Sequence, residues 1–188
     1  FDPDKAGREA AFKVGDLFQK AGIEVRVLFL PLGMDPDLIL LKEGKDVTIV
    51  STSHMALESF RAAKFLWGKG VEAEVIDLRT IKPLEEETIL NSVRKTGRLV
   101  VADGGWKFLG LPAEIITIVT EKVFDHLKAP PRRVVFPDTP TPTSWVLSNE
   151  FYPGLINIVN AAIGLLGLPD VDEAELGLSP DAPKDIPD

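Results

Sequence analysis

The chain has no cysteine and only two histidines among its 188 residues. Without cysteine it can form neither a disulfide nor a thiolate nucleophile, and cysteine-ligated zinc is excluded. His54 and His126 fall on different predicted helices, and neither has a serine or carboxylate at a diagnostic spacing. A catalytic triad or zinc site is therefore not expected, and both histidines are interpreted as surface or helix-end residues.

Basic charge is also scarce, because 21 lysines and arginines face 29 aspartates and glutamates, which leaves a net charge of −8. A broad surface for nucleic acid or anionic lipid needs concentrated lysine and arginine, so neither partner is expected. No apolar run approaches the roughly 20 residues that span a bilayer. The first residues lack the basic and apolar regions of a secretory leader. We therefore expect a cytoplasmic protein.

What the sequence does contain is a regular alternation of strand and helix patterns, with 45% hydrophobic residues. Runs rich in β-branched residues alternate with segments that have helical apolar spacing. The strands are expected at 23–30, 44–52, 72–80, 98–103 and 132–136, and the helices at 4–21, 54–67, 82–97, 112–127 and 155–166. This order is typical of a three-layer α/β/α fold with a mostly parallel sheet.

The junction around residues 38–42 has no linker composition, so residues 1–168 are expected to form a single integrated domain. The last 20 residues differ, because 169–188 contain five aspartates, two glutamates and four prolines but one lysine. A segment with so little apolar surface cannot offset the entropy of ordering. We expect this acidic, proline-rich tail to be poorly ordered.

Several motifs occur in a familiar order between residues 44 and 166. They include "EGKDVTIVSTSHMALES", "AEVIDLRTIKPLEEETI", "SVRKTGRLVVAD" and "FPDTPTPTSWVLSNEFYPG". This region resembles the C-terminal domain of the transketolase superfamily, in particular that of the β subunit of thiamine-diphosphate-dependent 2-oxo-acid dehydrogenases. The resemblance implies a domain that holds subunits together and contacts an acyltransferase core. Since other domains bind the cofactor in that family, thiamine diphosphate is not expected to bind here.

The region departs from the family pattern at several apolar positions. Where a glycine-rich loop is usual after "GWK", this chain has Phe108, Leu109, Gly110 and Leu111, and large aromatic residues stand at two other unusual places. Such residues should make the loop stiffer and favour a packing partner. We predict a packing or partner-contact patch from these apolar residues: Trp67, Trp106, Phe108, Leu109, Leu111 and Trp145. Its expected use is self-association into a homo-oligomer.

The first 40 residues resemble a different family. "FDPDKAGREAA" followed by "GIEVRVLFLPLGMDPD" is similar to the aspartate motif, helix and strand of the Toprim domain of bacterial primases. In that family the Asp-x-Asp pair binds metal, but its catalytic glutamate and leading strand lie before this point. Joining two families in this way is interpreted as an engineered chimera, a non-catalytic α/β scaffold.

Two rival functions remain open beside the scaffold. One is the subunit-assembly or partner-binding domain of a 2-oxo-acid dehydrogenase β subunit. The other is a Mg²⁺-dependent Toprim phosphotransferase or nuclease fragment. In that case Asp2 and Asp4 would coordinate the ion, because hard cations prefer carboxylate oxygens. A helix cap at Asp4 is favoured over this metal site, and a turn and cap is favoured for the pair Asp35 and Asp37.

Two further stretches could take a ligand. Ser51, Thr52 and Ser53 lie between a strand and a helix, where backbone amides can bind an anion, but a hydroxyl N-cap is the favoured interpretation. Gly104 and Gly105 begin a loop at the carboxyl edge of the sheet, where α/β folds place ligands, but their spacing is not that of a dinucleotide fingerprint. No cofactor and no catalytic residue is assigned from the sequence.

Overall fold

The computed structural model describes residues 38–40 and 44–177. The chain divides into two compact units, Phe1–Ile39 and Leu40–Asp188. The expected helix 4–21 and strand 23–30 lie outside the described residues, as do residues 178–188. Whether the first unit joins the sheet as one integrated domain therefore stays a prediction.

The described part is built on a central sheet of apolar strands. Within the second unit the strand order is β3-β2-β4-β5, with β2 at Val47–Thr52, β3 at Ala73–Leu78, β4 at Leu99–Trp106 and β5 at Arg132–Phe136. The short strand β1, Leu38–Leu40, lies across the boundary between the two units. Adjacent members of β3-β2-β4-β5 pair in parallel. Because a parallel sheet is covered on both faces, β2 and β3 are buried along their whole length.

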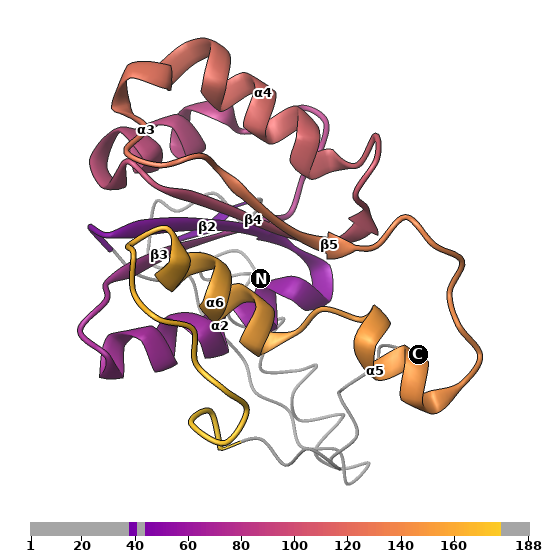
Figure 1. Ribbon diagram of the computed structural model, residues 1–188. Coiled ribbons are helices and arrows are strands. Elements are labelled where there is room, and N and C mark those ends of the chain that lie inside the picture. Colours follow the sequence, from indigo (N-terminus) through magenta and orange to yellow (C-terminus); the bar gives the residue numbers. More distant parts are fainter. Residues whose placement is uncertain (1–37, 41–43, 178–188) are drawn as a thin grey trace, which may run out of the picture. The chain divides into compact units, whose positions relative to one another are not determined.

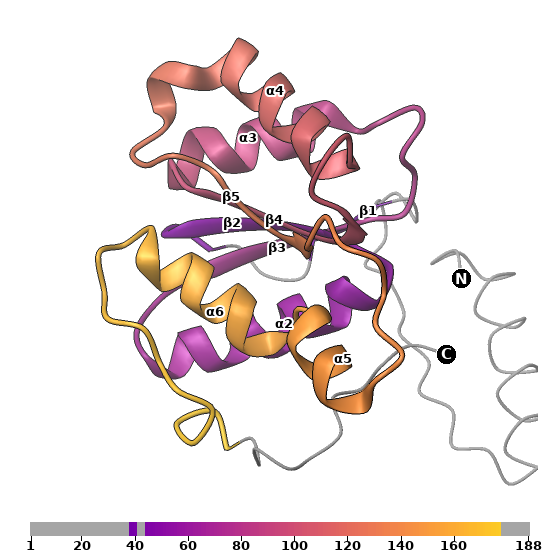
Figure 2. The same cartoon turned by 45° about the vertical axis from the view of Figure 1, so that its right-hand side comes forward.

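Helices cover both faces of this sheet. On one face lie α2 (Ser53–Gly68) and α6 (Leu155–Gly164), which pack against each other, and on the other lie α3 (Glu86–Thr96) and α4 (Leu111–Val123). Figure 2 shows the sheet between these two layers. A short 3₁₀ turn, η1 (Phe124–His126), follows α4, and helix α5 (Trp145–Phe151) follows β5. The predicted three-layer α/β/α fold with a parallel sheet is confirmed.

The alternation of side chains along β2 separates the two layers. Val47 and Ile49 belong to the apolar core shared with α2 and α6. The intervening Thr48 points to the other face, where its hydroxyl bonds to Ser92 and Thr96 of α3. A period of two therefore directs apolar and polar contacts to opposite faces of one strand.

Three segments differ from the expectations. Strand β4 continues through Gly104 and Gly105 to Trp106 with an irregular register against β5, where the sequence predicted a loop. Helix α5 was not predicted, because the sequence analysis assigned no helix or strand between the strand at 132–136 and the helix at 155–166. Residues 169–177 were assigned to the poorly ordered tail, yet Val171 and Leu176 pack against the core. The Asn160 side-chain amide donates to the Val171 carbonyl and accepts from the Val171 N–H.

Candidate functional site

Several of the exposed large apolar side chains lie where the strands end, and the others are spread over the rest of the described part. Because β2 to β5 are parallel, the segments that follow them share one edge of the sheet, which we call the carboxyl edge. Figure 1 shows the segments after β4 and β5 on one side of the sheet. Large side chains exposed on such segments are Ile81, Trp106, Phe108, Leu109 and Leu147. This edge is the candidate site.

The most exposed of these side chains belong to residues 106–110, which we call the tip loop. Phe108 is 73% and Leu109 87% exposed. Leu109 has a φ of 56°, in the left-handed region that an L-residue rarely adopts. Gly110 is required at the next position, because a Cβ there would collide with the carbonyl oxygen of Trp106. The loop therefore has a specific, strained backbone.

Hydrogen bonds from three neighbouring segments hold the tip loop and the strand that leads into it. The Phe108 backbone N–H donates to Asp138 Oδ1 at 3.0 Å, and Arg133 Nη1 donates to the Lys107 carbonyl at 2.8 Å. Just before the loop, Asp103 accepts hydrogen bonds from Gly105 N and from the Thr52 hydroxyl. These contacts fix the loop to β5 and β2, so its exposed side chains are presented on a rigid base.

An aromatic cluster lies beside the tip loop. Phe151 of α5 packs edge-on against Trp106, with ring centroids 6.3 Å apart, and lies 5.2 Å from Phe136 of β5. Tyr152 completes the cluster with edge contacts to Phe136 and Phe151. Sequence reasoning missed Phe136, Phe151 and Tyr152, although the aromatic pair before Pro153 was a visible signal. The cluster leaves Trp106 46% exposed next to Phe108.

The predicted patch is divided between the two edges of the sheet. Trp106, Phe108 and Leu109 are in the tip loop, and Leu111 follows as the half-buried first residue of α4. Trp67 instead lies near the end of α2, at the opposite edge, because α2 runs antiparallel to the strands. Trp145 begins α5, but its side chain lies outside the description. The tip loop and α5 thus form one surface without Trp67.

The hydroxyl N-cap predicted for α2 is wrong. Thr52 is the N-cap residue, but its hydroxyl donates to Asp103 and makes no cap hydrogen bond. Ser51 is fully buried and its hydroxyl has no partner among the described residues. Ser53 is exposed and has a φ of 50°. The sharp turn from strand to helix, which the sequence did not reveal, decides the orientations of the three hydroxyl groups. Anion binding by the backbone amides at this turn stays a prediction.

One carboxyl group at this edge is electrostatically unusual. Asp77, in register with Ser51 on the neighbouring strand, has a side chain only 7% exposed. Burial raises the pKa of Asp77, and the ion pair with Arg79 at 2.8 Å opposes this effect only in part. The free energy needed to ionise Asp77 in the folded protein is therefore larger than that of an ordinary aspartate.

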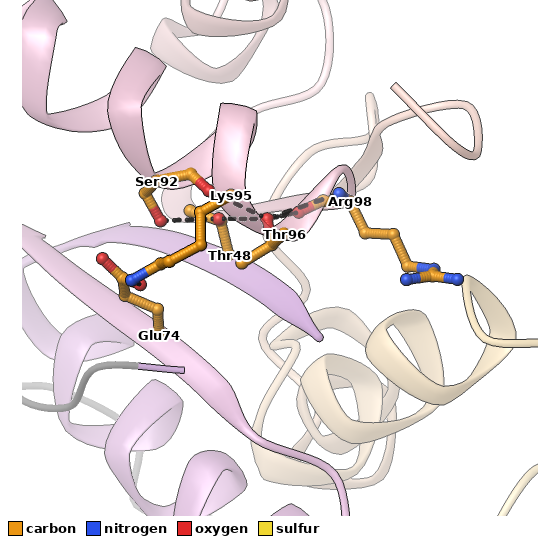
Figure 3. Close-up of polar contacts among 6 residues, drawn as sticks. All are labelled: Thr48, Glu74, Ser92, Lys95, Thr96 and Arg98. Atoms are coloured by element: carbon orange, nitrogen blue, oxygen red, sulfur yellow. Dashed lines mark hydrogen bonds and ion pairs between the residues drawn. The ribbon is translucent and has the colours of Figure 1, made fainter. Parts of the chain in front are cut away.

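A second polar cluster lies away from this edge, between β2, β3 and α3. Figure 3 shows Thr48 bonded to Ser92 and Thr96, both at 2.7 Å, with Glu74 of β3 paired to Lys95 of α3. Thr96 also donates to the Ser92 carbonyl at 3.1 Å. Because the three hydroxyl groups bond to one another inside the fold and Lys95 pairs with Glu74, the cluster attaches α3 to the sheet.

The remaining predicted residues offer no reactive grouping. His54 is half-buried in the first turn of α2, and His126 is exposed in η1, at the opposite edge. Within residues 44–177, no three His, Cys, Asp or Glu side chains lie close enough to share a metal ion. The predicted metal ligands Asp2 and Asp4, and the pair Asp35 and Asp37, lie outside the described residues. No helix in the described part is long and apolar enough to cross a membrane.

Comparison with known proteins decides the family. The family model "Transketolase, C-terminal domain" matches residues 37–158, which are more than half of the chain. The chain belongs to the transketolase C-terminal domain family. The family match begins at residue 37, so the Toprim resemblance of the first 40 residues and the chimera built on it receive no support from it.

Curated relatives of the chain are described as β subunits of a dehydrogenase and of an oxidoreductase. The chain is 46% identical over 121 residues to the mitochondrial pyruvate dehydrogenase E1 component subunit beta of Dictyostelium discoideum, covering 64% of this chain and 34% of that protein. It is 36% identical over 140 residues to the acetoin:2,6-dichlorophenolindophenol oxidoreductase subunit beta of Bacillus subtilis, covering 74% and 40%. The chain thus spans a little over a third of these curated relatives.

A solved structure supports the same fold. It is titled "Split gene transketolase, inactive beta4 tetramer" and matches with a TM-score of 0.63 at 29% identity. The match covers 78% of this chain and 47% of the solved chain.

Proposed function

We propose that this chain acts as the subunit-assembly domain of the β subunit of a thiamine-diphosphate-dependent 2-oxo-acid dehydrogenase. The observation that carries the proposal is the family match over residues 37–158 together with relatives described as pyruvate dehydrogenase E1 subunit beta. A related solved chain is described as a β tetramer, which supports contacts between copies. These natural relatives fit this function better than an engineered scaffold.

The carboxyl edge supports an assembly role physically. The edge exposes Trp106, Phe108 and Leu109 on segments that hydrogen bonds hold in place. A large exposed apolar patch on a stable protein usually marks an interface. The described residues contain no acidic cluster that would hold the Mg²⁺ of a diphosphate cofactor. That this part of the chain is non-catalytic stays a prediction of the proposed role.

The proposal predicts self-association of the full chain in solution. Sedimentation velocity should show species larger than a monomer, and their fraction should increase with protein concentration. The physical reason is that burial of the exposed apolar edge favours association. Calorimetric titration with thiamine diphosphate and Mg²⁺ should give no binding heat. A monomer at every concentration would contradict the assembly role, and tight cofactor binding would contradict the non-catalytic assignment.

A further inference from the structure

A small folded segment follows α6, at the yellow end of the ribbon in Figure 1. It consists of residues 171–177, and we call it the strap. The Glu175 N–H donates to Asp172 Oδ1 at 2.8 Å, and the Gly177 N–H donates to the Ala174 carbonyl at 3.0 Å. Gly177 has a φ of 69°, which glycine adopts readily. The turn of the strap is therefore defined by bonds within the strap itself.

An exposed connector joins the strap to α6. The end of α6 is closed by Gly167 with a φ of 72° and by a hydrogen bond from the Leu168 N–H to the Ile163 carbonyl. Leu168, Pro169 and Asp170 come next and are all exposed. Segments with few buried contacts open locally at a lower free energy than the core. The connector thus allows the strap to leave the surface while α6 stays folded.

The contacts that attach the strap to the helices are those of a bound peptide. The side-chain amide of Asn160 in α6 donates to the Val171 carbonyl at 3.1 Å and accepts from the Val171 N–H at 2.9 Å. Val171 and Leu176 are half-buried against the core that α2 and α6 share. Domains that bind extended peptides use the same two means, since backbone hydrogen bonds give affinity and spaced apolar side chains give specificity.

An ion pair gives this attachment a preferred sign of charge. Lys69, at the end of α2, binds Glu175 Oε2 at 2.6 Å, and its ammonium group lies 5.5 Å from the centre of the Phe65 ring. The strap also contains Asp172 and Glu173 and has no basic residue. An exposed ion pair contributes little affinity, but it favours an acidic sequence over a basic one.

We propose that the surface of α2 and α6 beneath the strap is a peptide-binding site, and that the strap is its removable occupant. The ligand class is a short acidic peptide with two apolar residues five positions apart, as Val171 and Leu176 are. Asn160 bonds the backbone of the first apolar residue, and Lys69 pairs with the acidic residue before the second. This site is independent of the proposed assembly role.

The tether of the strap explains how the site is closed. A segment on a short linker has an effective concentration on the order of millimolar at its site. A free peptide of equal affinity therefore binds only where the strap has been weakened. The strap acts as an autoinhibitory contact, and its opening makes the site available.

Hydrogen exchange of the full chain tests whether the strap opens as a unit. The Val171 N–H should have a protection factor at least tenfold lower than the amides of β2, because it is freed by local opening. Leu176→Ser should lower that protection factor further, although it lies five residues away. Leu147→Ser is the matched control, since Leu147 is 57% exposed in α5 and should leave the Val171 N–H unchanged.

A double variant of the full chain tests the site with a free peptide. Val171→Ser with Leu176→Ser removes both apolar contacts of the strap and keeps Asn160 and Lys69. A synthetic peptide of residues 169–177 should cause saturable NMR shifts in α6 of this variant, and it should bind the wild type at least tenfold more weakly. The same peptide with serine at both apolar positions should not bind.

Two asparagine variants locate the binding surface. Adding Asn160→Ala to the double variant should abolish peptide binding, whereas adding Asn91→Ala, at an exposed position of α3, should not change it. Protected amides in β2 would show that each variant is folded, and the single Leu176→Ser variant replaces the double variant if the latter unfolds. Unchanged protection of the Val171 N–H in Leu176→Ser would overturn the inference. So would the absence of peptide binding to the opened chain, or equal binding to the wild type.

Discussion

Ser53 illustrates how a single residue is placed by its neighbours against its own preference. It lies between β2 and α2 with a φ of 50°, and its side chain is exposed. A residue with a Cβ is disfavoured in this region, whereas glycine adopts it readily. The backbone there is set by the connection of a buried strand to a packed helix, so the serine tolerates the strain.

We therefore expect Ser53→Gly to stabilise the fold. Glycine relieves the strain of the left-handed backbone, but its greater freedom in the unfolded chain offsets part of that gain. The net effect should raise the free energy of unfolding by roughly 0.5–1 kcal/mol. Ser144→Gly is the matched control, because Ser144 is exposed and has an ordinary φ of −81°. This variant should lower the free energy of unfolding by a few tenths of a kcal/mol. Urea unfolding of both variants measures the difference. A loss of stability in Ser53→Gly would show that the serine side chain contributes more than the strain costs.

Among the helices, α2 and α6 are joined by one buried carboxylate. Glu58 of α2 is 6% exposed and accepts a hydrogen bond from the backbone N–H of Leu155, the first residue of α6, at 3.0 Å. It also accepts one from Arg61 at 2.7 Å. A negative charge at a helix start is stabilised by the helix dipole as well as by the hydrogen bond. The two helices of one layer are thus fixed by polar as well as apolar contact.

Removing this carboxylate should loosen α6. Glu58→Ala leaves the part-buried Leu155 N–H without its acceptor and should lower the free energy of unfolding by about 1–2 kcal/mol. Glu58→Gln keeps an acceptor oxygen and should cost less than half as much. Urea unfolding gives the free energies, and hydrogen exchange should show faster exchange in the first turn of α6. Equal costs for the two variants would mean that charge alone, and not the acceptor, decides the stability.

At the scale of the whole molecule, the buried Asp77 links stability to pH. Burial raises its pKa in the folded state above the ordinary value of 3.8. A carboxyl group whose folded pKa is raised favours folding fully at a pH below the unfolded pKa. That contribution is lost as the pH rises from 3.8 through the raised folded pKa.

Asp77→Asn should remove this pH dependence. The unfolding free energy of the wild type minus that of the variant should fall as the pH increases through this window, because only the wild type must ionise a buried group. Urea unfolding at a series of pH values from acid to neutral measures the difference. An opposite slope would show that the Arg79 ion pair outweighs burial. Asp125→Asn, at an exposed aspartate of η1, is the matched control for the removal of one carboxylate.

Local patterns in the sequence determined much of the architecture. Helix α3 has Glu86 and Glu87 in its first turn, Arg94 and Lys95 in its last turn, and Gly97 after it with a φ of 73°. These signals act within a few residues, so they can be read without the fold. The strands β2 and β3 were predicted from a similar local pattern, since their burial on both faces requires apolar, β-branched residues.

Only the tertiary structure decided the contacts that form the candidate site. Leu109 became an exposed, left-handed residue because Asp138 and Arg133, from a distant strand and the loop after it, hold the tip loop. Glu58 caps a helix that begins 97 residues later in the chain. No local pattern encodes such pairs, because each depends on segments that meet only when the sheet and its layers are assembled. The sequence by itself therefore determined most helices and strands of residues 44–177 and the resemblance of this region to the transketolase C-terminal domain. Packing decided which side chains the carboxyl edge presents.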